Sequence, residues 1–139
     1  MSRYRNIALI VLMLLLGATL AHAQQVVTQD EGSITEDEPI AEFEIALEEG
    51  QTVVINVDTT DGDLDPVLVL LDSNGDVVAE NDDRGEYFDR NSRIIYTAED
   101  TDTYIAEVSA YNDASTGDFN IEFRVGGDEL LDNPYGEDA

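Results

Sequence analysis

Two acidic loops hold the side chains of this sequence that are best suited to chemistry. The six side chains are Asp61, Asp63 and Asp65 in the first loop, and Asn81, Asp82 and Asp83 in the second. Carboxylate and amide oxygens are the ligands that calcium prefers, and calcium takes about six to eight of them in flexible geometry. The loops offer neither His nor Cys to softer metals. Gly62 would let the first loop turn tightly. The pattern therefore predicts a calcium site.

The alternative is that these carboxylates belong to a solvated acidic surface. The first loop is not an EF-hand. Asp61, Asp63 and Asp65 match the first ligands of that motif, but Pro66 stands where its glycine is required.

The charge of the chain excludes several classes of protein. It has 32 Asp and Glu against 6 Lys and Arg, a net charge of -26 and a pI near 4.1. Such a surface repels phosphate backbones and anionic membranes, so we expect no nucleic-acid partner. Because the chain has no Cys, it can form neither a disulfide framework nor a cysteine nucleophile.

The N-terminal residues 1–23 are typical of a secretory signal peptide. Arg3 and Arg5 precede an apolar run over Ile7–Leu16, and Ala21-His22-Ala23 supplies small side chains for cleavage after Ala23. An uncleaved membrane anchor is the alternative. Cleavage predicts a secreted or periplasmic protein without an anchor, and it removes both Met and the only His. A Ser–His nucleophile or a histidine zinc site would then lack an essential member.

The rest of the chain predicts an all-β fold. We expect an acidic flexible leader over 24–39, a domain over 40–125 and an acidic tail over 126–139. Within the domain, short segments alternate apolar and polar residues, as half-buried strands do. Phe43, Ile45 and Leu47 form one such face, and the clearest strand, 118–125, begins its inward face with Phe119. About seven to eight short strands without a helical period indicate an antiparallel, jelly-roll-like β-sandwich.

The order of the strands places the loops. Val67–Leu71 is a continuous apolar run, suited to a strand that is covered on both faces. It forms a hairpin with 77–79 through the turn at Asp72–Asp76, which sets Val67 opposite about Asp82. The loops 58–66 and 81–84 must then lie side by side. The same alternation brings Glu36–Glu38, Asp89 and Asp113 to that end, and it sends Glu48, Glu49, Asp72, Asp76 and Glu99–Asp102 to the other.

These segments resemble the bacterial pre-peptidase C-terminal domain, which is also similar to the collagen-binding modules of secreted collagenases. The resemblance covers about Ile40 to Val125. Its motifs are DLDP (63–66), VLVLLDSNGDVVAENDD (67–83), NSRI (91–94) and TDTYIAEV (101–108). It implies a jelly-roll sandwich of secreted proteins, and in the collagen-binding relatives it implies calcium at acidic loops and an aromatic ligand surface. The family usually has Gly where this chain has Asp102.

Three aromatic residues are candidates for ligand binding. Tyr87, Phe88 and Tyr111 lie in or beside loops at the same end as the acidic cluster, and aromatic residues beside polar rims are common recognition anchors. The alternative is that they fold back and cap the core.

We therefore expect a secreted, non-catalytic, calcium-stabilised module that binds an extracellular polymer or an exported protein. The alternative is an acidic accessory domain that buffers calcium or aids the solubility or folding of an exported protein, without a specific ligand. An enzyme with a carboxylate pair, as in glycoside hydrolases, is disfavoured because so small a sandwich has little room for a deep pocket.

Overall fold

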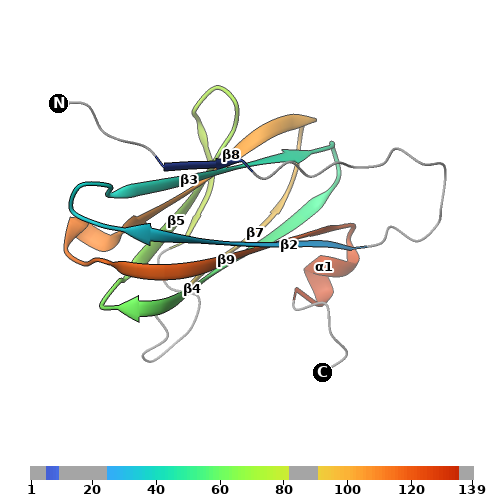
Figure 1. The fold of residues 1–139 in the computed structure, drawn as a ribbon. Helices are drawn as coiled ribbons and strands as arrows, with labels where there is room; N and C mark the ends of the chain where they lie inside the picture. The colour runs from blue at the N-terminus through green and yellow to red at the C-terminus, as the bar shows by residue number, and fades with distance from the viewer. Residues whose placement is uncertain (1–5, 10–24, 82–90, 135–139) are drawn as a thin grey trace.

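Two β-sheets pack face to face in the computed structural model, which describes residues 6–9, 25–81 and 91–134 (Figure 1). The first sheet has the order β1-β3-β8-β5-β6 and the second has the order β2-β9-β4-β7. The strands of the first sheet are β1 (Asn6–Leu9), β3 (Ile40–Leu47), β8 (Asp102–Ala110), β5 (Pro66–Leu71) and β6 (Val77–Asn81). Those of the second are β2 (Val26–Ile34), β9 (Gly117–Gly126), β4 (Thr52–Gly62) and β7 (Ser92–Thr97). The predicted all-β sandwich is confirmed.

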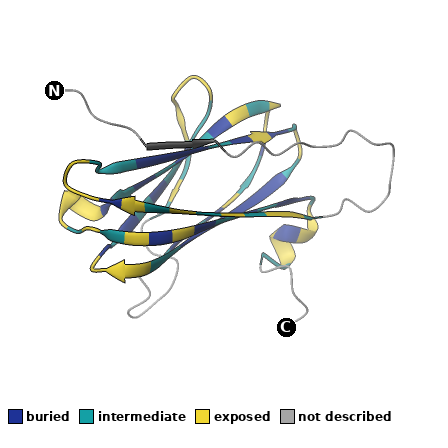
Figure 2. Cartoon of the chain, viewed as in Figure 1, coloured by how far each residue is buried: buried dark blue, intermediate teal, exposed yellow. Residues whose placement is uncertain are grey.

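The core lies between the two sheets and consists of the alternating apolar residues (Figure 2). Phe43, Ile45 and Leu47 of β3 are buried, and so are Phe119 and its inward neighbours on β9. The ring centroids of Phe43 and Phe119 are 6.0 Å apart in an edge-on arrangement, which aromatic pairs favour. The two-residue alternation therefore identified the buried faces of these strands correctly.

The hairpin of β5 and β6 forms where it was expected. Leu68 pairs with Asn81, and the carboxylate of Asp72 accepts hydrogen bonds from the amides of Asn74 and Asp76 in the turn. The prediction that 67–71 is covered on both faces is wrong, because only Leu68 and Leu70 of its apolar side chains are fully buried. The strand with both faces buried is β4, where α1 (Glu129–Asp132) packs against the outer side of the sheet.

Residues 26–34, expected to belong to a flexible leader, form β2. This strand pairs with β9 from Val26–Val125 to Ile34–Gly117. Its sequence shows no alternation of apolar and polar residues, because most of its positions are polar and at least partly exposed. Gly32 provides space for a neighbouring ring: a Cβ atom there would lie 2.6 Å from Cζ of Phe119.

The expected acidic tail is also wrong in its first part. Residues 129–132 form α1, and its Leu130 is fully buried. One buried side chain in a four-residue helix gives no helical period in the sequence, so the segment was not recognisable. No helix among the described residues is long and apolar enough to cross a membrane.

The loops at one end of the sandwich gather as predicted around Asp102. Its carboxylate accepts hydrogen bonds from the amide and the hydroxyl of Ser73, at 3.1 and 2.8 Å. These bonds hold the pKa of Asp102 below its ordinary value. Asp102 is also the first residue of β8 and pairs with Leu47 of β3. At the position where the resembled family usually has glycine, the aspartate side chain of this chain thus joins the start of β8 to the turn that contains Ser73.

Candidate functional site

The opposite end of the sandwich is built from two loops that are hydrogen-bonded to each other. We call residues 63–65, between β4 and β5, and residues 111–116, between β8 and β9, the loop end. The amide of Asp63 donates to the carbonyl of Thr116 at 3.2 Å, and the amide of Thr116 donates to the Asp63 carboxylate at 3.3 Å. The amide of Asp65 donates to the hydroxyl of Ser115 at 2.9 Å. These bonds fix one loop against the other.

The two loops approach each other at a pair of glycines. Gly62 has φ +82, and a Cβ atom on it would lie 2.7 Å from the carbonyl oxygen of Thr116. Gly117 faces it across the ladder of β4 and β9. Only glycine permits both this backbone conformation and this contact. The prediction that Gly62 supports a tight turn is consistent with this geometry.

Tyr111 projects from the loop end into solvent, with 49% of its surface exposed. It begins the 3-10 turn η1 (Tyr111–Asp113), in which Asn112 and Asp113 have φ values of 55° and 53°. Left-handed backbone costs non-glycine residues energy, and two such residues in succession are uncommon. Tyr111 therefore does not cap the core, and a constrained turn presents it outward.

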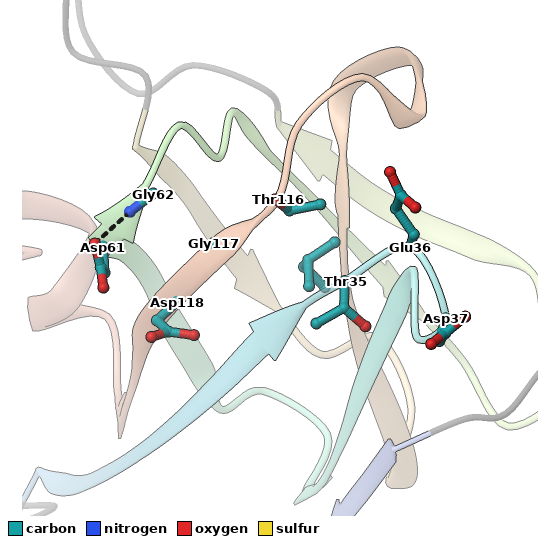
Figure 3. A pocket seen from close by; sticks show the side chains of 9 residues that line it. Thr35, Glu36, Asp37, Asp61, Gly62, Thr116, Gly117 and Asp118 are labelled. Atoms are coloured by element: carbon teal, nitrogen blue, oxygen red, sulfur yellow. Dashed lines mark hydrogen bonds between the residues drawn. The ribbon is translucent and has the colours of Figure 1, made fainter.

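A hollow of about 520 Å³ lies between β2, β4 and β9 and reaches Thr116 of the loop end. Four carboxylates line it together with Thr35 and Thr116; they belong to Glu36, Asp37, Asp61 and Asp118. Figure 3 shows Asp61 and Asp118 at one side of the hollow and Glu36 and Asp37 at the other. A smaller hollow of about 180 Å³ continues past Glu36 to Asp113. The acidic loops thus border a continuous concave surface.

A β-bulge brings two of these carboxylates face to face. The register of β4 and β9 shifts between Thr59 and Asp61, which places Asp61 opposite Asp118. Like charges at such positions repel, and each carboxylate accepts a hydrogen bond that stabilises it. The Ser33 hydroxyl donates to Asp118 at 2.6 Å, and the Gly62 amide donates to Asp61 at 2.8 Å.

The described residues include four of the six predicted calcium ligands. Asp61, near the end of β4, and Asp63, at the loop end, are exposed, and Asp65 is half-buried. The Asn81 side-chain oxygen accepts the amide of Arg93 at 3.3 Å. The described residues contain no group of three or more acidic side chains placed to hold a metal. They do not form a calcium cage by themselves. The remaining predicted ligands, Asp82 and Asp83, lie outside the described residues.

Of the three aromatic residues predicted to bind a ligand, one lies among the described residues. Tyr111 is exposed at the acidic end, whereas Tyr87 and Phe88 lie outside the described residues. Sequence reasoning missed Thr35, Thr116 and Asp118 as lining residues of the hollow. The Thr35 hydroxyl accepts a hydrogen bond from the amide of Glu38 at 3.0 Å. The Thr-x-x-Glu sequence of residues 35–38 is a known signal for such a turn, and it could have located Thr35.

The family model of the bacterial pre-peptidase C-terminal domain matches residues 43–110. A solved pre-peptidase C-terminal domain of a Bacillus anthracis collagenase has a TM-score of 0.55 at 16% identity, over 90% of this chain and 97% of that one. An Aeromonas hydrophila periplasmic inhibitor of g-type lysozyme has a TM-score of 0.51 at 12% identity, over 88% and 98%. No curated protein sequence matches the chain.

At these identities the two structures are similar in fold. The family match runs from β3 to β8, and it includes all four sequence motifs that resemble the family. Residues 43–110 of the chain therefore match the bacterial pre-peptidase C-terminal domain family, over just under half of its length.

Proposed function

We propose that this protein is an exported, non-catalytic module that binds an extracellular protein or polymer through its loop end. One observation carries the proposal: Tyr111 is exposed on a constrained turn. A large aromatic side chain in water is a common anchor of recognition surfaces. Backbone strain persists where the surroundings hold it in place, and it clusters at binding sites.

The turn lowers the cost of binding through Tyr111. Its amide donates to the carbonyl of Asp65, and the amide of Ala114 donates back to the carbonyl of Tyr111 at 3.2 Å. A backbone that is already ordered loses little entropy when a partner arrives. Only the side-chain rotation of the tyrosine remains to be restricted.

The charge of the loop end selects the kind of partner. Carboxylates line the two hollows at this end, which reach Asp113 and Thr116, so a partner with cationic groups around an apolar contact fits best. The Aeromonas hydrophila protein of this fold is an inhibitor of a lysozyme. We carry a protein partner over to this chain as part of the proposal, together with a periplasmic or extracellular location.

Calcium belongs to the proposal as a stabilising ion. Asp61, Asp63 and Asp65 support it because they lie on one short stretch of chain, and the proposed site also uses Asp82 and Asp83. Bound calcium would neutralise part of the acidic loops and hold their oxygens in place.

The test measures binding of the full chain and of residues 24–139 to a g-type lysozyme and to collagen by biolayer interferometry. We expect Tyr111→Ala to weaken binding about tenfold or more, as truncation of a central anchor does. The matched control is Val77→Ala, because Val77 is 57% exposed at the opposite end. Both variants should melt within a degree or two of the parent, since surface truncations change stability little.

The accessory-domain alternative predicts a different result. If binding depends on charge alone, it should disappear in high salt, and Tyr111→Ala should leave it unchanged. If every probe that binds does so equally well with Tyr111→Ala, the proposed surface is wrong.

A further inference from the structure

The edge of the first sheet is already occupied by a short strand from the far N-terminus. β1 runs parallel to β3, with Asn6 opposite Ala41, Ile7 opposite Glu42, Ala8 opposite Phe43 and Leu9 opposite Glu44. Figure 1 draws β1 along the outer side of β3. Sequence reasoning assigns residues 1–23 to a signal peptide, so this strand is the part of the chain that export would remove.

Without β1, β3 would be an open sheet edge of a kind that proteins usually protect. The pairing of β3 with β8 is regular over its whole length, from Ile40–Ser109 to Leu47–Asp102. No proline, lysine or bulge interrupts it. By contrast, β6, at the opposite edge of the same sheet, is short and its register shifts between Leu70 and Leu71. A long, regular edge presents unpaired amides and carbonyls that accept another strand.

We propose that the β3 edge is a strand-acceptor site, at which an extended segment of a partner polypeptide docks parallel to β3 once the N-terminal segment has been removed. The partner would add a strand to the sheet, a mode of recognition in which main-chain hydrogen bonds give affinity and alternate side chains give specificity. In the full chain, Asn6–Leu9 holds the same place.

The register of the edge defines the chemistry of the segment. Ala41 and Phe43 are core residues, whereas the carboxylate of Glu44 lies on the outer face and is half-exposed. Paired residues of parallel strands point to the same face of the sheet. The segment should therefore have an apolar side chain opposite Phe43, as Ala8 is in the full chain, and a cationic or neutral side chain opposite Glu44. A second copy of β3 fits poorly, because its own glutamates would meet those of the first.

The part of the chain that carries this edge holds the whole core. Every described buried core residue lies between Ile34 and Leu130, so residues 24–139 retain the two packed sheets. Expression of 24–139 therefore provides the open edge directly and does not depend on cleavage after Ala23.

The experiment follows backbone amide exchange of β3 by NMR. The probe is a capped, uncharged peptide containing the residues of β1, Asn-Ile-Ala-Leu, between solubilising Gly-Ser ends. Added to 24–139, it should slow exchange of alternate β3 amides by about tenfold at ten times its Kd, and leave β2 and β7 unchanged. A nitroxide on its N-terminus should broaden the amides near Ala41 more than those near Leu47, as a parallel strand requires.

Matched controls separate strand pairing from general stickiness. The same peptide with Pro in place of Ala should not protect β3, because proline has no amide to donate. In the full chain, Ala8→Pro should speed β3 exchange and Ala8→Val should not. A peptide with Lys in place of Leu, opposite Glu44, should bind residues 24–139 more tightly. The Glu44→Gln variant of the protein should lose that gain.

Three results would overturn the proposal. They are equal protection by the proline peptide, protection spread over all sheet edges, and protection of β3 that grows with protein concentration in the absence of peptide. The last would assign the edge to self-association. Because Tyr111 and the loop end take no part in this docking, Tyr111→Ala should leave peptide protection unchanged.

Discussion

The backbone amide of Tyr111 donates a 2.9 Å hydrogen bond to the carbonyl of Asp65. The bond joins an exposed aromatic residue to the loop that carries three of the predicted metal ligands. The bond therefore connects the backbone of the acidic loop directly to the turn that presents Tyr111. Binding of a cation and binding of a partner are therefore expected to influence each other at this end of the sandwich.

Gly62→Ala should destabilise the fold more than Gly75→Ala. The two glycines have nearly the same φ, +82 and +84, so alanine meets the same backbone strain at both. At Gly62 the new Cβ atom also lies 2.7 Å from the Thr116 oxygen, whereas at Gly75 nothing lies within 4 Å. We expect about 1–3 kcal/mol of additional loss at Gly62, measured as the difference between the two variants in urea unfolding. Equal losses would mean that the loops separate without cost.

Leu130→Ala should cost about 2–5 kcal/mol, as other fully buried leucines do. Its neighbour Leu131 is 52% exposed, while Leu130 is fully buried. Leu131→Ala is therefore a matched control, because it makes the same truncation in the same helix at an exposed position, and it should cost less than about 0.5 kcal/mol. Equal thermal stability of the two variants would contradict the packing of α1 against the sheet.

How far the sequence predicts this fold depends on the exposure of each strand. Phe119, Ile121 and Phe123 alternate with polar residues because one face of β9 meets the core, so their strand was recognisable. β2 was not, because its partly buried positions include Asp30 and Gly32. β2 is held in the sheet by its backbone pairing with β9. Such pairing leaves no periodic pattern of apolar side chains from which the strand could be predicted.

The candidate site was predictable only to the level of topology. Strand reversal placed the acidic loops at one end, and Asp61 and Glu36 do line one hollow. The bonds that shape this end, such as Asp65 to Ser115, depend on loop conformations that no periodicity encodes. The outward direction of Tyr111 depends likewise on two left-handed residues, which the sequence Asn-Asp permits but does not require.

The stability of the protein should fall between about pH 10 and pH 12 partly through Tyr104. Burial, followed by the effect of the neighbouring Tyr96, raises the pKa of Tyr104 to about 12 from an ordinary value of 10.0. The unfolded chain therefore loses this proton first, so stability is complete below pH 10 and is lost as the pH rises through the folded-state pKa. Urea midpoints measured across this range provide the test.

Tyr104→Phe is the variant that isolates this effect. It removes the hydroxyl that donates to the carbonyl of Asp100 at 2.8 Å, which should cost about 1 kcal/mol near neutral pH. Above pH 10 its stability should decline less steeply than that of the parent. Parallel declines would assign the alkaline loss to other groups.

Calcium should raise the melting temperature of residues 24–139 beyond any effect of ionic strength. An ion that binds only the folded state stabilises it by about 2.7 kcal/mol at one hundred times its Kd. Melting in EDTA, in calcium and in magnesium at matched ionic strength measures this effect. Lowering the pH should weaken it, because the ligand carboxylates must be ionised.

The acidic composition of the chain makes a charge-matched control necessary. Asp82→Asn combined with Asp83→Asn should abolish the calcium shift, because the proposed site uses both carboxylates as ligands. Glu99→Gln combined with Asp100→Asn removes the same charge at the opposite end of the sandwich, where both side chains are exposed, and should leave the shift intact. If magnesium or sodium chloride raises the melting temperature as much as calcium does, screening of a repulsive surface explains the effect and the calcium site is wrong.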